Sequence, residues 1–233
     1  MDYLPFFVLG FRSNPFRRLT NDEWVAVAVL PDQLLRLARN SSDHIQVLGA
    51  QGRGKSTCLR ALAARFTDDG LRTVYEYLTP GRNSFRTSLD GLDVFLLDET
   101  QRLEVHERTR LLAAASNRRR GLRLVVGVHD DMSSPFFSHR LPLATVHIDS
   151  ITPAYLQAVL SRRLALFALD DPPAITFSAD AVRYLCDAFG SDLRLAERFL
   201  YEVFQSKPPR DRLTSAMLGW FETRRPSPAG EFQ

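Results

Sequence analysis

One segment constrains the fold of this chain more than any other. Residues 49–56 read GAQGRGKS, which has the spacing G-x-x-x-x-G-K-S of a phosphate-binding loop. A short apolar run, residues 44–48, precedes the segment, and residues 56–66 follow it with apolar side chains at helical spacing. A chance match is the alternative, but this context favours a β-strand, a phosphate-binding loop and an α-helix in that order.

The residue types of the segment fit phosphate chemistry. Glycines let successive backbone N–H groups point at phosphate oxygens, and the positive end of the following helix faces the same anion. The sequence has lysine at only two positions, 55 and 207, and arginine at its other Lys or Arg positions, which number 30 in all. Lysine in the loop of so arginine-rich a chain favours a specific role, because a guanidinium does not replace a compact ammonium group there. We predict nucleotide contacts from Gly49, Gln51, Gly52, Arg53, Gly54, Lys55, Ser56 and Thr57, with Mg²⁺ held by Ser56.

Strand and helix patterns alternate through the first two thirds of the chain. Further strands are expected at 72–78, 92–97, 122–128 and 144–148, with a helix at 103–118 and a turn-rich stretch at 79–91. Only helices are expected after residue 152, at about 152–169, 179–189, 192–205 and 211–223. This pattern predicts an α/β P-loop NTPase with a doubly wound parallel five-stranded sheet, followed by a small all-helical lid domain. The expected division is a leader and helices (1–43), an ATPase core (44–150), a lid (151–223) and a flexible tail (224–233).

Acidic residues end the strand predicted at 92–97. Asp98 and Glu99 follow an apolar run, as in a Walker B motif, where the first acid holds Mg²⁺ and the second activates water. His129 ends the next predicted strand and faces the same edge of a parallel sheet. Arg194 lies in the first turn of a predicted helix, where an anionic partner such as ATP would stabilise its charge. Ordinary solvated side chains are the alternative at each position.

The composition is that of a globular protein, and its net charge is too small to attract polyanions strongly. The formal net charge is +3 and the hydrophobic content is 45%. Cys58 and Cys186 match no zinc spacing and are expected to be reduced thiols. No stretch has membrane-spanning length and the start lacks the pattern of a signal peptide, so we expect a cytoplasmic protein.

Several segments together resemble the AAA+ ATPases. They are GAQGRGKST, VFLLDETQRL, VVGVHDD and GSDLR, and the resemblance extends from about residue 14 to about residue 204. DETQRL and the leader SNPFRRLT are similar to the corresponding segments of the ExeA/TniB/TnsC-like group of bacterial ATPases. Two features depart from the family: 79–91 leaves little room for the helix usual between the second and third strands, and the short carboxyl tail leaves no room for an appended domain.

The resemblance also implies roles for single residues. His129 would be sensor 1, Arg194 would be sensor 2, and Phe16 and Leu19 would lie near the adenine. A neighbouring subunit would complete the site with Arg140, for which Arg118, Arg119 and Arg120 are rivals that can equally be a solvated helix end.

Three functions follow from these patterns. The first is an ATP- and Mg²⁺-dependent switch that assembles into a ring or filament on a DNA-linked complex, as transposition regulators do, with phosphate contacts from Arg17, Arg18 and Arg118–Arg120. The second is a nucleotide-gated adaptor for a protein partner in secretion or defence, with Phe136 and Phe137 as contacts unless they pack in the core. A small-molecule kinase is the weakest, because no substrate-binding lid is predicted between the strands.

Overall fold

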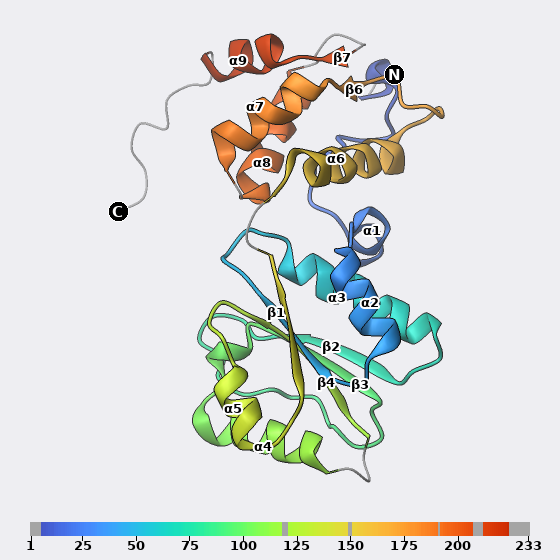
Figure 1. Cartoon of the computed structure of the whole chain (residues 1–233). Helices are drawn as coiled ribbons and strands as arrows, with labels where there is room; N and C mark the ends of the chain where they lie inside the picture. Colours follow the sequence, from blue (N-terminus) through green and yellow to red (C-terminus); the bar gives the residue numbers. More distant parts are fainter. Residues whose placement is uncertain (1–5, 118–120, 149–150, 191, 207–211, 224–233) are drawn as a thin grey trace. The chain divides into compact units, whose positions relative to one another are not determined.

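The structure, a computed structural model, describes residues 6–117, 121–148, 151–190, 192–206 and 212–223 (Figure 1). The chain divides into two compact units. We call Thr20–Ser150 the sheet unit, and Met1–Leu19 together with Ile151–Gln233 the helical unit. The predicted flexible tail and the rival arginines 118–120 lie outside the described residues.

The sheet unit contains one five-stranded parallel sheet in the order β2-β3-β4-β1-β5. Strand β3, between β2 and β4, is buried along its whole length, as expected of a strand covered on both faces. The predicted five-stranded parallel sheet is therefore confirmed. The strands are β1 (His44–Leu48), β2 (Thr73–Tyr77), β3 (Val94–Asp98), β4 (Arg123–Val128) and β5 (Leu143–His147).

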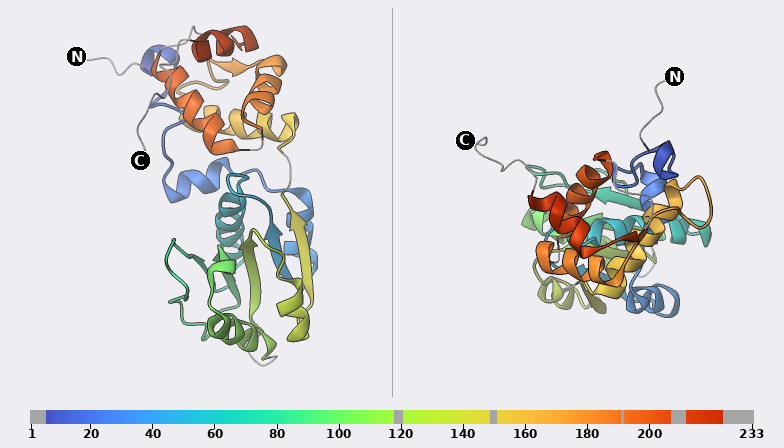
Figure 2. Two further views of the ribbon diagram at one scale, coloured as in Figure 1. Left: turned by 90° about the vertical axis from the view of Figure 1, so that its left-hand side faces the viewer. Right: turned by 90° about the horizontal axis from the view of Figure 1, so that it is seen from above.

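Helices cover both faces of this sheet (Figures 1 and 2). Because side chains alternate along a strand, Val94 and Leu96 pack on one side of β3, while Phe95 and Leu97 pack on the other. The first side packs against α2 (Asp32–Asn40) and α3 (Lys55–Asp68). The second side packs against α4 (Val105–Ser116) and α5 (Ser133–Ser138).

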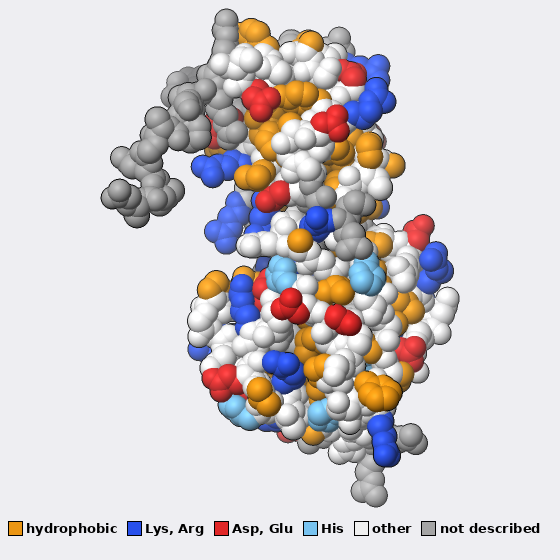
Figure 3. Space-filling model, turned by 60° about the vertical axis from the view of Figure 1, so that its left-hand side comes forward, with side chains coloured by type: hydrophobic (Ala, Val, Ile, Leu, Met, Phe, Trp, Pro, Cys, Tyr) orange, Lys and Arg blue, Asp and Glu red, His pale blue; other side chains and the backbone are white. Residues whose placement is uncertain are grey.

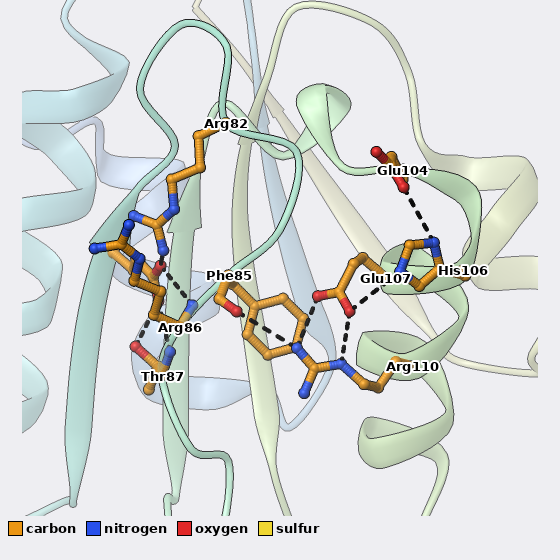
Figure 4. Close-up of polar contacts among 9 residues, drawn as sticks. Arg82, Phe85, Arg86, Thr87, Glu104, His106, Glu107 and Arg110 are labelled. Carbon is orange, nitrogen blue, oxygen red and sulfur yellow. Dashed lines mark hydrogen bonds and ion pairs between the residues drawn. The ribbon is translucent and has the colours of Figure 1, made fainter.

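The stretch between β2 and β3 contains no helix, as predicted. Arg86 and Thr87 of this stretch, labelled in Figure 4, hold it in place instead, because their backbone N–H groups donate to the Glu76 carboxylate at 2.9 and 3.0 Å. Phe85 and Leu89 of this stretch enter the core on the α4 side of the sheet. These side chains add to the apolar packing on this face of the sheet.

The predicted leader is divided between the two units. Thr20 begins the sheet unit by capping α1 (Asn21–Val27) in a capping box with Glu23. Phe11 and Phe16 instead pack against Phe204 in the helical unit, with ring centroids 5.8 and 5.1 Å apart. Apolar burial therefore assigns the first part of the leader to the helical unit.

The helical unit is built from α6 (Pro153–Phe167), α7 (Ala179–Phe189), α8 (Leu193–Gln205) and α9 (Ser215–Thr223), with a short 3-10 helix η1 (Phe7–Leu9). The expectation of helices alone after residue 152 was wrong in one detail. Two residues of β6 (Thr176–Phe177) pair in parallel with two of β7 (Arg212–Leu213). Runs of two residues are too short for a strand periodicity to be visible in the sequence.

Between the strands β4 and β5, residues 133–138 form the short helix α5. Phe136 is fully buried in the sheet unit, whereas Phe137 is 84% exposed. One of the two phenylalanines therefore packs in the core, and the other remains available for contacts. A helix of six residues that contains Pro135 gives too little helical periodicity to predict from the sequence.

Candidate functional site

The phosphate-binding loop joins β1 to α3 at the carboxyl end of the sheet. The Gly49 N–H donates to the Val128 carbonyl (3.2 Å), and a Cβ at position 49 would lie 2.5 Å from the Ile148 carbonyl oxygen. Gly52 and Gly54 have φ values of +83° and +89°, in the left-handed region that favours glycine. Two glycines thus permit the turn, and a third permits close packing against the neighbouring strand end.

Lys55 begins α3 and is buried, with 5% of its surface exposed. Its Nζ donates to the carbonyls of Gly49 (2.7 Å) and Ala50 (3.0 Å), which holds the ammonium group over the loop. The first turn of α3 carries no acidic residue, so its positive end is not neutralised locally. Ser56 and Thr57 are partly buried beside Lys55, Arg53 is partly buried, and Gln51 is exposed.

Asp98 ends β3 and is completely buried. Its Oδ1 accepts the Glu99 backbone N–H (3.1 Å), and its Oδ2 accepts the Tyr75 hydroxyl (3.0 Å). Burial and the nearby Asp98 charge raise the pKa of Tyr75, so this hydroxyl keeps its proton. The carboxylate is therefore fixed in the protein interior by donors on both oxygens.

Glu99 follows in the left-handed region, with φ +60°. One carboxylate oxygen lies 3.1 Å from His129 Nε2, and the other accepts the Gln101 amide (2.8 Å) and pairs with Arg102 (3.1 Å). Burial alone would raise the pKa of Glu99, but the hydrogen bond and charge of His129 and the charge of Arg102 outweigh it and lower the pKa. The structure thus brings Glu99 and His129 into direct contact.

His129 follows β4, whose neighbour in the sheet is β1 on one side and β3 on the other. The segment after His129 is held by Gln46, a buried residue of β1, whose Oε1 accepts the Met132 N–H (3.0 Å). The same amide donates to Asp131 and to Thr145 Oγ1 (2.8 Å). A buried polar network on β1 therefore sets the course of the chain that carries His129.

The remaining predicted residues lie elsewhere. Arg194 is exposed in the first turn of α8 in the helical unit, where Asp192 caps the helix by accepting the Arg194 N–H (2.9 Å). Phe16 and Leu19 also belong to the helical unit and are 4% and 5% exposed. Their contact with adenine stays a prediction.

Arg140 is exposed at the end of α5, in the sheet unit. Its N–H donates to the Phe137 carbonyl (2.9 Å) and the Leu141 N–H donates to the Phe136 carbonyl (3.0 Å), which is the Schellman pattern of a helix end. Arg140 has φ +55° at the position where such an end usually has glycine. A shallow hollow beside it is lined by Phe137, Ser138, Arg140, Leu141 and Pro142.

Three residues of the site were not predicted from the sequence: Tyr75, Gln101 and Arg102. Arg102 joins Glu99 to the end of β2, because its guanidinium also donates to the Leu78 carbonyl and lies over the Tyr77 ring (5.8 Å). A tyrosine on a partly buried strand could have indicated a polar partner for the Tyr75 hydroxyl. Nothing in the spacing of Gln101 and Arg102 distinguishes them from a solvated turn.

The residues present fit a nucleotide with Mg²⁺. Asp98 offers a buried carboxylate and Ser56 a hydroxyl, which are oxygen ligands of the kind that Mg²⁺ prefers. Within the described ranges, no cluster of three or more His, Cys, Asp or Glu side chains could hold a metal by itself. A magnesium ion here would therefore depend on phosphate oxygens for further ligands.

The strand order, with a phosphate-binding loop after β1 and acids at the end of β3, defines the P-loop fold of the AAA+ ATPases. No protein-family model matches the sequence, and no curated protein matches it. Solved structures do resemble it. RuvB of Thermotoga maritima, a Holliday junction branch migration motor, has a TM-score of 0.60 at 19% identity over 87% of this chain and 67% of RuvB.

Two further structures resemble the chain. Domain III of the Thermotoga maritima replication initiation protein DnaA has a TM-score of 0.57 at 11% identity, over 88% of this chain and 98% of that domain. NtrX from Brucella abortus, in complex with ADP, has a TM-score of 0.53 at 16% identity, over 88% of this chain and 56% of NtrX. At these identities the comparisons define the fold. In the described part of the chain, no helix combines the length and the apolar character needed to span a membrane.

Proposed function

We propose that this chain is an AAA+ ATPase that binds ATP with Mg²⁺, assembles with further copies of itself, and acts on a DNA-linked assembly. One observation carries the proposal. The phosphate-binding loop, the buried Asp98 and the Glu99–His129 pair follow the carboxyl ends of β1, β3 and β4, which are neighbouring parallel strands.

Each residue has a task in this proposal. The loop N–H groups and Lys55 bind the phosphates, while Ser56 and Asp98 hold Mg²⁺, which neutralises charge on the phosphate oxygens when bound. Glu99 orients the attacking water and accepts its proton, and His129 orients Glu99 through the 3.1 Å contact. For Arg194, in the first turn of α8, we keep the sensor 2 role that the sequence resemblance implies.

The proposed role of Arg140 is to complete the site of a neighbouring copy. Its support is the helix end that carries it: a residue with a Cβ in the left-handed region is disfavoured by about 1 kcal/mol. Such strain at an exposed charged residue is a reason to suspect a function that glycine could not perform. An exposed guanidinium can stabilise the charge that develops on a phosphate bound by another subunit.

DNA as a partner has support of a different kind. RuvB is a branch migration motor on Holliday junctions and DnaA initiates replication, so two proteins of similar fold work on DNA. The charge distribution adds little support for DNA binding. The net charge is +3, and basic and acidic side chains are interspersed over the described surface seen in Figure 3. Transposition regulation and a cytoplasmic location remain sequence-based proposals.

A nucleotide-gated adaptor for a protein partner is the second candidate. The 84% exposed Phe137, beside Arg140 and the shallow hollow, is the observation that favours it, because an exposed aromatic side chain is a common contact in protein interfaces. The two candidates share the nucleotide site and differ in what the assembled protein touches.

The mass of the protein in solution separates these candidates. It would be measured with ADP and with a non-hydrolysable ATP analogue, each with and without duplex DNA. Assembly that needs both analogue and DNA supports the DNA-linked switch, and assembly with the analogue alone favours the adaptor. A monomer under all four conditions would remove Arg140 from the mechanism.

Lys55→Ala tests whether any assembly depends on the phosphate-binding loop. Lys207→Ala is the matched control, since residue 207 is the other lysine of the chain. Loss of nucleotide binding in the first variant alone is expected. Nucleotide binding that survives Lys55→Ala undiminished would contradict the proposed site.

A further inference from the structure

We propose that Tyr75 is a positioning residue that fixes the Asp98 carboxylate for a divalent cation. The inference rests on the proposed function, because it concerns the acid that we assign to Mg²⁺. It goes beyond that function because it gives Tyr75, on the neighbouring strand β2, a role in orienting the metal ligand Asp98.

The geometry begins with the register of the two strands. Tyr75 of β2 lies opposite Leu96 of β3, and both side chains pack on the α3 side of the sheet. Asp98 is two residues beyond Leu96 and therefore faces the same side. The Tyr75 hydroxyl reaches along this face to Asp98 Oδ2 at 3.0 Å.

The second oxygen of Asp98 has little freedom. Oδ1 accepts the Glu99 N–H at 3.1 Å, and a Cβ built on Gly127 would lie only 2.5 Å from it. The carboxylate is thus packed against the backbone of β4, while Tyr75 holds its other side. A hydrogen-bonded carboxylate keeps one orientation, which lowers the entropy lost when it binds a cation.

Arg60 holds the tyrosine in turn. Its guanidinium, on α3, lies over the Tyr75 ring with 5.4 Å between the guanidinium carbon and the ring centroid. The helix that begins with Lys55 therefore contacts the tyrosine that holds Asp98. This arrangement connects the phosphate-binding side of the site to its acidic side through a single aromatic residue.

Simple core packing is the competing explanation for Tyr75, and it predicts a different result. Phenylalanine keeps the ring, its packing and its contact with Arg60, but removes the donor to Asp98. If Tyr75 only fills space, Tyr75→Phe should behave as the native protein does. If it positions Asp98, metal binding should weaken without loss of the fold.

The experiment titrates Mg²⁺ into the full chain with a fluorescent ADP analogue, and Mn²⁺ into the same complex with detection by electron paramagnetic resonance. We expect Tyr75→Phe to weaken metal binding about 10-fold, as losses of such supporting hydrogen bonds do, and to leave metal-free nucleotide affinity unchanged. Tyr201→Phe is the control, because its hydroxyl accepts a hydrogen bond from Gln205 (2.8 Å) on α8 of the helical unit.

Each outcome distinguishes the inference from the proposed function. Native protein that binds nucleotide without any metal dependence would overturn both. A metal-dependent native protein with an unaffected Tyr75→Phe variant would overturn only the role of Tyr75. Should Tyr75→Phe not fold, Gly127→Ala provides the second test, since its methyl group displaces the same carboxylate from the other side; unchanged metal affinity there would also overturn the inference.

Discussion

Glu99 and Arg140 have the same unusual backbone and opposite surroundings. They are the non-glycine residues with positive φ in the described part of the chain, at +60° and +55°. Glu99 is 9% exposed and is held by His129, Gln101 and Arg102. Arg140 is exposed, and no carboxylate of the described residues pairs with its side chain.

The difference between these two residues is informative about assembly. A strained residue whose side chain is fully held in its own subunit can act there without help. A strained residue whose charge points to solvent gains from its conformation only if a partner supplies the counter-charge. The contrast therefore predicts one residue that acts within its own subunit and one that acts on a neighbour.

The largest effect should come from Arg140→Ala, which we expect to reduce ATP hydrolysis by about 10³-fold, the loss typical of an arginine that acts in trans. Mixing tests the direction of action. Arg140→Ala subunits keep an intact loop, while Lys55→Ala subunits keep an intact Arg140, so the mixture should regain part of the activity that neither has alone.

Arg36→Ala, at an exposed arginine of α2, is the matched control for loss of one surface charge and should be fully active. If Arg140→Ala hydrolyses ATP as fast as this control, the proposed difference between Glu99 and Arg140 is wrong, because Arg140 then has no catalytic task.

Glu99→Gln should reduce hydrolysis by about 10²-fold while nucleotide and metal still bind, because an amide keeps the shape but cannot accept the proton of water. Single-turnover phosphate release and nucleotide affinity separate the two effects. The control is Glu104→Gln at an acid whose side chain is 48% exposed. If Glu99→Gln hydrolyses ATP at the native rate, a group other than Glu99 accepts the proton of the attacking water.

Arg140→Gly tests whether the backbone at residue 140 is strained, through the free energy of unfolding. Glycine adopts the left-handed region without a Cβ penalty, so we expect the glycine variant to exceed Arg140→Ala in free energy of unfolding by about 1 kcal/mol. Both variants should be equally inactive. Denaturant unfolding of the two proteins checks this, and equal stabilities would show that the +55° conformation is not strained in solution.

The smallest effect concerns the pH dependence set by Arg102. The pKa of Glu99 lies below its ordinary value of 4.5, so its carboxylate contributes stability above that pH and loses it as the pH falls through the folded-state pKa. Burial opposes this lowering, and the contacts with His129, Arg102 and Gln101 produce it. Arg102→Ala should therefore move the acid limb of hydrolysis to higher pH.

Arg108→Ala is the control for this last prediction, because Arg108 donates to the Leu103 carbonyl (3.2 Å). A pH profile that Arg102→Ala leaves in place would mean that the contacts with His129 and Gln101 account for the lowered pKa of Glu99.

The sequence alone determined the parts of the molecule that depend on local pattern. The loop spacing of residues 49–56 and the apolar runs that become β1, β3 and β4 predicted the parallel sheet and the position of the phosphate-binding loop. Asp98, Glu99 and His129 were predicted as one cluster because strands in a parallel sheet end at the same edge. Short-range periodicity and backbone chemistry carry this information.

Which side chains support these residues follows from contacts between distant parts of the chain. The Tyr75 hydrogen bond to Asp98 depends on a strand register, and the close approach of Gly127 depends on packing between β3 and β4. The division of the leader likewise depends on where Phe11 and Phe16 find apolar surface. Contacts between residues distant in sequence leave no local pattern, because they arise when the chain buries its apolar area as a whole.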